Sequence, residues 1–263
     1  MEKIISKDGT PIAFWRSGKG PPLVLVHGST ADHSTTWKFV LPELEMKFKC
    51  FAVDRRGRGG SGDSKPYYLQ REAEDIVAIV DSIGEPVNLL GHSYGGLCAI
   101  EASLLTSNLR KLILYEGVTL KGANIYPVGF IEQLEILLKK GDVEGVIVTM
   151  VRELVNMAQK EIDMLRRDAS WKVRVANAPT IPRECRAESE YVFQPKRFKD
   201  MRAPTLLLVG SESPAYQRSD AEGVARALPN SRVVILPGQG HAAMHTASDL
   251  FLREVLRFLE AKR

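Results

Sequence analysis

A serine placed between two glycines is the most specific chemical signal in this sequence. Residues 91–95 read Gly-His-Ser-Tyr-Gly, which matches the pattern Gly-x-Ser-x-Gly with Ser93 at its centre. A short apolar run at 87–90 precedes the motif and a helical pattern at 97–105 follows it, so we expect a strand that turns directly into a helix. Such a turn strains its central residue, and the flanking glycines remove side chains that would clash. The motif predicts that Ser93 is a nucleophile held above the carboxyl end of a strand.

A serine hydroxyl becomes a good nucleophile only when a neighbouring base takes its proton. His241 lies in the glycine-rich stretch 237–241 after the last apolar run. This late position agrees with the chain order serine, acid, histidine that accompanies the Gly-x-Ser-x-Gly motif in known hydrolases. His245 is the alternative, but it falls where the next helix should begin. We expect His241 to be the general base, and we expect structural roles for the remaining histidines, which are His27, His33 and His92.

The elements that must position these residues alternate between short apolar runs and longer helical patterns, which indicates a mostly parallel sheet. Two alternating segments, 2–7 and 11–16, predict an antiparallel hairpin at the start of the chain. Six further runs are almost wholly apolar, as in strands buried on both faces; they are residues 23–26, 50–53, 87–90, 112–115, 205–209 and 233–236. The sequence therefore predicts an α/β fold with an eight-stranded, mostly parallel sheet flanked by helices.

A long interval between the sixth and seventh predicted strands, residues 117–202, contains no convincing strand. It is too long for a loop in a compact domain, and it shows three amphipathic helical patterns, at 130–139, 143–157 and 161–176. We predict a core domain formed by 1–116 and 203–263, with 117–202 as an inserted helical cap. Three methionines recur in it every seven residues, a spacing typical of internal packing, although methionines also line apolar pockets; they are Met150, Met157 and Met164.

Several motifs in a fixed order resemble the α/β-hydrolase family, most closely its haloperoxidase-like and esterase-like members. Besides the serine motif, residues 26–29 (Val-His-Gly-Ser) resemble the family's oxyanion turn, and residues 54–62 resemble its loop after the fourth strand. Residues 237–241 resemble its histidine loop, and 117–202 lies where the family places its cap. The resemblance covers nearly the whole chain and implies the α/β-hydrolase fold and a serine-hydrolase site.

The resemblance also implies the position of the oxyanion hole. The tetrahedral intermediate of acyl transfer needs two backbone N–H donors directed at its oxyanion. By the family's geometry these belong to Tyr94, which follows the nucleophile, and to Ser29, which follows His27 and Gly28. The alternative for Ser29 is an ordinary loop hydroxyl.

The carboxylate that orients the histidine is left open by the sequence. In the family it usually follows the seventh strand as Gly-x-x-Asp, but here Ser213 occupies that position. Glu116 is the leading candidate, because it closes the sixth predicted strand, where some family members carry their acid. Glu212 and Asp220 are alternatives, although the alternation of side chains at a strand end turns Glu212 away. A site without any acid is the fourth interpretation.

These residues predict a serine hydrolase that cleaves a small carboxylic ester or a related acyl compound through an acyl-enzyme on Ser93. Apolar residues of the cap predict that the substrate is partly apolar. A cofactor-free lyase or perhydrolase with the same triad is one alternative, and a slow-turnover ligand-binding or regulatory protein is another. Serine at position 93 argues against relatives that use Asp there, which are haloalkane dehalogenases and epoxide hydrolases.

Composition excludes several other classes of protein. The 263 residues are 44% hydrophobic and 26% charged, as in an ordinary globular domain. The net charge of +4 is spread along the chain without long runs, so we expect neither nucleic acid nor a membrane as partner. We expect no metal or organic cofactor, because ligand clusters and nucleotide fingerprints are missing. The three cysteines lack metal-ligand spacing, and the N-terminus does not resemble a signal peptide, so we expect a cytoplasmic protein.

Overall fold

Eight strands form one sheet in the computed structural model, which describes residues 1–154 and 157–261. The strand order is β1-β2-β4-β3-β5-β6-β7-β8. The pairs β1/β2 and β2/β4 are antiparallel, and the other five pairs are parallel. The predicted α/β fold with eight mostly parallel strands is confirmed. Their bounds are β1 Glu2–Ile5, β2 Pro11–Ser17, β3 Pro22–Val26, β4 Lys49–Val53, β5 Val87–His92, β6 Leu109–Tyr115, β7 Thr205–Gly210 and β8 Ser231–Leu236.

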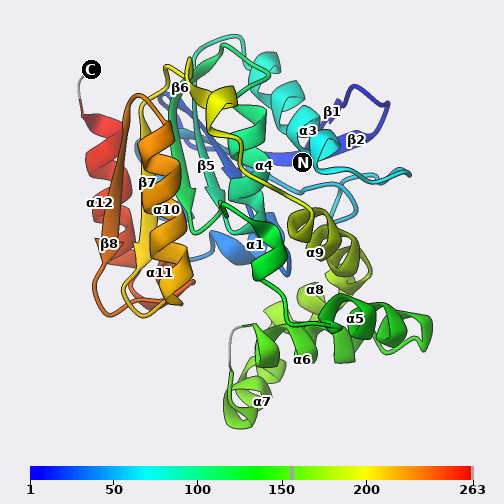
Figure 1. The fold of residues 1–263 in the computed structure, drawn as a ribbon. Helices are drawn as coiled ribbons and strands as arrows, with labels where there is room; N and C mark the ends of the chain where they lie inside the picture. Colours follow the sequence, from blue (N-terminus) through cyan, green and yellow to red (C-terminus); the bar gives the residue numbers. More distant parts are fainter. Residues whose placement is uncertain (155–156, 262–263) are drawn as a thin grey trace.

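Each face of the sheet is covered by its own helices (Figure 1). Alternate residues of a strand point to opposite faces, so Val24 of β3 packs in one buried cluster and Leu25 in the other. The first cluster includes side chains of α3, α4 and α10, and the second includes side chains of α2, α11 and α12. The helices of the core are α1 His33–Thr36, α2 Leu41–Glu45, α3 Leu69–Ser82, α4 Tyr94–Ala102, α10 Ala215–Ala227, α11 Ala243–Thr246 and α12 Ser248–Glu260.

The predicted helical insertion lies between β6 and β7 and has its own apolar core. Figure 1 shows α5 to α8 gathered at one end of the molecule, with α9 closer to the sheet domain. Within the described part of the insertion the only β pairing is a single bridge between Lys121 and Val192. Its helical segments are η1 Gly122–Asn124, α5 Phe130–Lys139, α6 Val143–Glu153, α7 Gln159–Arg167, α8 Ser170–Asn177, η2 Ala178–Thr180, α9 Ile181–Ser189 and η3 Pro195–Phe198.

Two of the three helices predicted in the insertion have different bounds in the structure. The helix expected over 143–157 ends at Glu153. The helix expected over 161–176 is divided between α7 and α8. Asp168 lies at the division, and its side chain accepts a hydrogen bond from the Ser170 N–H at 2.8 Å. The predicted methionine stripe is therefore interrupted: Met150 is buried in the insertion's core, whereas Met164 is 62% exposed.

Four buried charged side chains join the insertion to the core; we call Arg55, Arg58, Glu72 and Glu184 the junction cluster. Arg55 donates to Glu72 of α3 through Nε (3.1 Å) and Nη2 (2.8 Å), and to Glu184 of α9 through Nη2 (2.7 Å). Arg58 also pairs with Glu184. All four residues are at most 2% exposed. Two positive and two negative charges balance here, as buried charges must.

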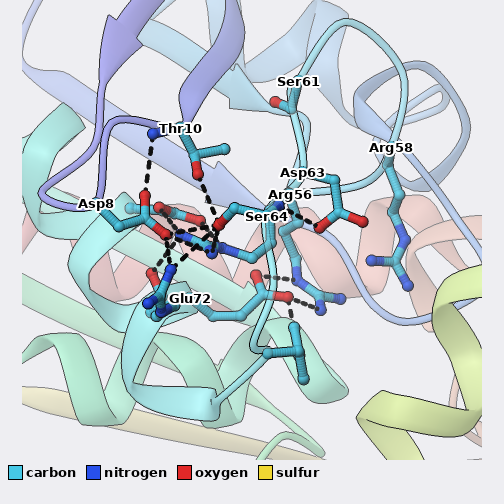
Figure 2. A network of polar contacts seen from close by, with 12 residues as sticks. Asp8, Thr10, Arg56, Arg58, Ser61, Asp63, Ser64 and Glu72 are labelled. Atoms are coloured by element: carbon cyan, nitrogen blue, oxygen red, sulfur yellow. Dashed lines mark hydrogen bonds and ion pairs between the residues drawn. The ribbon is translucent and has the colours of Figure 1, made fainter.

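The loop that carries Arg55 and Arg58 is fixed from its other side by the β1–β2 turn (Figure 2). Asp8 accepts hydrogen bonds from Arg56 Nη1 at 3.0 Å and from Ser64 Oγ at 2.8 Å. Arg56 Nε and Nη2 each lie 2.7 Å from an oxygen of Asp75 in α3. Because both sides of the loop are held, Arg55 and Arg58 have fixed positions from which to bind Glu184 of α9.

No helix within the described ranges is both long and apolar enough to cross a bilayer.

We predict that Glu184→Gln lowers the free energy of unfolding by about 3–5 kcal/mol, because it leaves two buried arginines with one carboxylate. The matched control is the neighbouring ion pair between Arg183 of α9 and Asp63, whose atoms lie 2.8 and 2.9 Å apart and whose Asp63 side chain is 41% exposed. Because solvent screens this pair, Asp63→Asn should cost about 0–1 kcal/mol. Urea unfolding of both variants measures these losses in free energy of unfolding. Equal losses would contradict the expected difference between a buried ion pair and one that solvent screens.

Candidate active site

Ser93 lies at the turn between β5 and α4 in a strained conformation. Its φ of 54° and ψ of −134° are rare for a residue with a side chain. The turn is so tight that a Cβ on Gly95 would lie 2.3 Å from the carbonyl oxygen of His27, and a Cβ on Gly91 would lie 2.6 Å from the Cα of Gly96. The Ser93 N–H donates to the carbonyl of Tyr115 at 2.9 Å. The glycines of the motif are therefore required by close backbone contacts, and they hold the Ser93 side chain at the carboxyl end of the sheet.

Glu116 and His241 are brought together although they are far apart in the sequence. Their Oε2 and Nδ1 atoms are 2.6 Å apart. The second carboxylate oxygen accepts from the Gly210 N–H at 2.7 Å and from Ser213 Oγ at 2.5 Å. Burial opposes the ionisation of Glu116, but these bonds and the proximity of His241 outweigh it and hold the pKa of the carboxyl below its ordinary value. Glu116 is thus suited to orient and stabilise a protonated imidazole.

The other acids considered in the sequence lie elsewhere. Glu212 has an exposed side chain that accepts a hydrogen bond from Ser211 at 3.0 Å. Asp220 accepts from Thr119 Oγ1 at 2.9 Å. Ser213, at the usual position of the acid, donates to Glu116, so its short side chain supports a carboxylate that comes from the neighbouring strand.

The histidine loop is positioned by two aromatic side chains. His92 Nε2 lies 2.8 Å from the carbonyl oxygen of His241, and the two rings are 4.7 Å apart between centroids. The Tyr115 hydroxyl donates to the Gly240 carbonyl and accepts from the Ala243 N–H at 3.0 Å. Burial lowers the pKa of His92 well below its usual value, so this ring is neutral at pH 7 and acts as a brace.

The remaining histidines have structural contacts. His27 is fully buried between the Gly28 carbonyl (2.8 Å) and the Arg55 N–H (3.2 Å). His33 binds Asp54 through Nδ1 at 2.7 Å and stacks on Trp15. His245 lies in α11, where its ring meets Phe39 edge-on.

The two residues expected to form the oxyanion hole lie on either side of Ser93. Tyr94 is the first residue of α4, so its backbone N–H has no intrahelical acceptor. On the other side, a Cβ on Gly28 would lie 2.9 Å from Ser93 Cβ, which places the segment leading to Ser29 against the nucleophile. The Ser29 carbonyl accepts from Arg58 Nε at 3.2 Å and Nη2 at 2.7 Å. The junction cluster therefore holds the backbone of the predicted oxyanion loop.

The role of Arg58 and Glu184 was not found from the sequence. An arginine in a glycine-rich loop and a glutamate in an amphipathic helix are each typical of solvated positions. Three of the four residues 55–58 are arginines. Such a density of positive charge predicts acidic partners nearby, and it was the one sign of the cluster in the sequence.

One group of side chains in the described ranges has the spacing to hold a metal ion: Asp32, His33 and Asp54. Asp54 already accepts hydrogen bonds from His33 and from the Gly60 N–H at 2.8 Å. Asp32 caps α1 by accepting from the N–H groups of Ser34 and Thr35. These contacts fit a structural group that shapes the loops beside Ser29.

Comparisons with known proteins agree with this fold. The model of the alpha/beta hydrolase family matches residues 23–254. A solved alpha/beta hydrolase from Sphaerobacter thermophilus DSM 20745 is 30% identical, with a TM-score of 0.85 over 98% of this chain and 100% of that one. The esterase RhEst1 from Rhodococcus sp. ECU1013 is 23% identical, with a TM-score of 0.77 over 99% and 98% of the two chains.

Among curated sequences, 2-hydroxy-6-oxo-6-(2'-aminophenyl)hexa-2,4-dienoic acid hydrolase of Metapseudomonas resinovorans is 24% identical over 100% of this chain and 92% of that protein. The strained serine turn, the sheet order and the match to the family over most of the chain lead to one conclusion: this protein is a member of the alpha/beta hydrolase family.

Proposed function

We propose that the protein hydrolyses a small, partly apolar carboxylic ester or related acyl compound through an acyl-enzyme on Ser93. The observation that carries the proposal is the 2.6 Å contact between His241 Nδ1 and Glu116 Oε2, because it leaves Nε2 of the same ring free to serve the nucleophile. Membership of the family supports it, and so does the similarity to a solved esterase.

The proposed reaction has two halves. His241 Nε2 removes the proton of Ser93 as its Oγ attacks the ester carbonyl, and Glu116 stabilises the imidazolium that forms. The backbone N–H groups of Ser29 and Tyr94 bind the oxyanion. The imidazolium then protonates the departing alcohol, which leaves the acyl group on Ser93. In the second half His241 removes a proton from water, and hydroxide attack releases the carboxylic acid and restores Ser93.

The contact between Glu116 and His241 argues against one of the two alternative functions and leaves the other open. A site without the usual Gly-x-x-Asp acid would favour a slow-turnover binding protein, but here Glu116 lies beside His241 instead. A lyase or perhydrolase would use the same residues, so only its products distinguish it from an esterase.

We predict that a fluorophosphonate forms one covalent adduct, on Ser93, since the reagent reacts with activated serines. Intact-mass and peptide mass spectrometry locate the adduct, and 4-nitrophenyl acetate reports turnover. Ser93→Ala should lose the adduct and reduce kcat by at least about 10⁴-fold. A folded protein that takes no label would refute the proposal, and labelling with fewer than one turnover per molecule would favour the binding protein.

The role of Glu116 is tested by moving the carboxylate. Glu116→Gln should lower kcat by roughly 10⁴-fold, because the amide disfavours the required imidazole tautomer. In Glu116→Ala, a second substitution, Ser213→Asp, should recover at least about tenfold, since the side chain at position 213 reaches the Glu116 carboxylate in the present structure.

The matched controls for that experiment are Glu212→Gln and Asp220→Asn, which remove the other candidate carboxylates. Both should keep kcat within about twofold of the parent protein, because their contacts lie away from His241. A large loss in either control, with Glu116→Gln still active, would reassign the acid.

A further inference from the structure

Arg174 of α8 lies on the face of the insertion that meets the predicted oxyanion loop. Its Nη1 donates to Thr30 Oγ1 at 2.8 Å, and Thr30 follows Ser29 directly. One turn later, Asn177 Nδ2 donates to the Ala31 carbonyl at 3.0 Å. Two side chains of one helix face therefore bind consecutive residues of the loop, and these hydrogen bonds hold the Arg174 guanidinium against it.

The Arg174 guanidinium has no carboxylate partner within ion-pair distance anywhere in residues 1–154 and 157–261. Its Nε is buried without a hydrogen-bond acceptor. The charges of Asp168 and Asp32 act on it from a distance, but burial outweighs them and lowers the pKa of Arg174 below its ordinary value. A largely buried arginine without an anion is costly, in contrast to the balanced junction cluster.

The positive charge of Arg174 acts on two histidines, His92 and His245. Burial is the main cause of the lowered pKa of His92 and of His245, and the positive charge of Arg174 lowers both further. His92 precedes the nucleophile, and its ring is 4.7 Å from that of His241. Because Thr30 follows Ser29 and His92 precedes Ser93, the Arg174 charge acts on the two segments that flank the predicted nucleophile.

We infer that Arg174 binds a carboxylate of the substrate, so that the ester hydrolysed at Ser93 carries one additional carboxylate group. The inference rests on the proposed function and specifies its substrate class. The planar fork of an arginine matches the two oxygens of a carboxylate. A single unpaired cation with Asp168 and Asp32 nearby favours one negative charge over the two of a phosphate monoester.

The carboxylate can belong to the acyl part of the ester or to its alcohol part, and two pairs of substrates distinguish these cases. Methyl hydrogen adipate and methyl 6-amino-6-oxohexanoate differ only in carboxylate against carboxamide on the acyl side. 3-Acetoxypropanoate and 3-acetoxypropanamide make the same comparison on the alcohol side. In at least one pair, kcat/KM of the parent protein should be about 10- to 100-fold higher for the carboxylate, the range expected of a charge-assisted hydrogen bond.

The variants assign that preference to one side chain. Arg174→Gln should reduce the ratio of kcat/KM for the carboxylate substrate to kcat/KM for the carboxamide substrate to about 1. Arg174→Lys should give an intermediate ratio, because lysine keeps the charge but lacks the planar fork of arginine. Lys172→Gln is the matched control: it removes the same charge from an exposed position of the same helix and should leave the ratio unchanged. Circular dichroism checks that each variant is folded.

A second measurement needs no turnover. Glutarate at millimolar concentration should raise the Tm of the parent protein and of Lys172→Gln, but not of Arg174→Gln, because only a folded protein with the arginine binds it. Ester hydrolysis and fluorophosphonate labelling without a carboxylate preference or a glutarate shift would overturn the inference and leave the proposed function intact. A glutarate shift in a protein that neither labels nor turns over would retain the anion site and overturn the proposed function.

Discussion

The Glu116 carboxylate is where the parts of the site meet. One oxygen faces His241 and the other accepts hydrogen bonds from the Gly210 N–H and the Ser213 hydroxyl. Glu116 itself has a φ of 45°, which is unusual for a residue with a side chain. Strand β6, the end of β7 and the histidine loop must all be in place before this group is satisfied, so a buried carboxylate that would be costly alone becomes a stable orienting group.

Buried arginines divide into two kinds in this protein. Those of the junction cluster are matched by glutamates from α3 and α9, and one of them, Arg58, holds the proposed oxyanion loop through the Ser29 carbonyl. Arg174 contacts the same loop from α8 but has no carboxylate partner in the described ranges. The first kind has its electrostatic requirement met within the fold, whereas the second is left for a ligand. The insertion thus both completes the loop beside the nucleophile and brings charge to it.

Local patterns were sufficient for much of the architecture. Short apolar runs are buried on both faces of a parallel sheet, so their number and order were readable, and the hairpin of β1 and β2 followed from alternation. The serine turn was equally readable, because its strain and its glycines belong to five consecutive residues. The helix break near Asp168 was missed, because no glycine or proline marks it in the sequence. Met164 lies on the exposed side of α7, which its seven-residue spacing from the other methionines did not predict.

The sequence alone determined the fold class, Ser93 as the candidate nucleophile and His241 as the favoured base, because each depends on residues close together along the chain. Only the tertiary structure could decide which acid lies beside His241, since that choice depends on β6 and β7 being neighbours in the sheet and on the direction of one side chain at a strand end. It also decided that Glu184 pairs with two arginines, whereas Arg174 has no carboxylate partner among the residues that the structure describes. Ion pairing between distant segments leaves no local pattern, because it arises only when burial removes the water that otherwise solvates each charge.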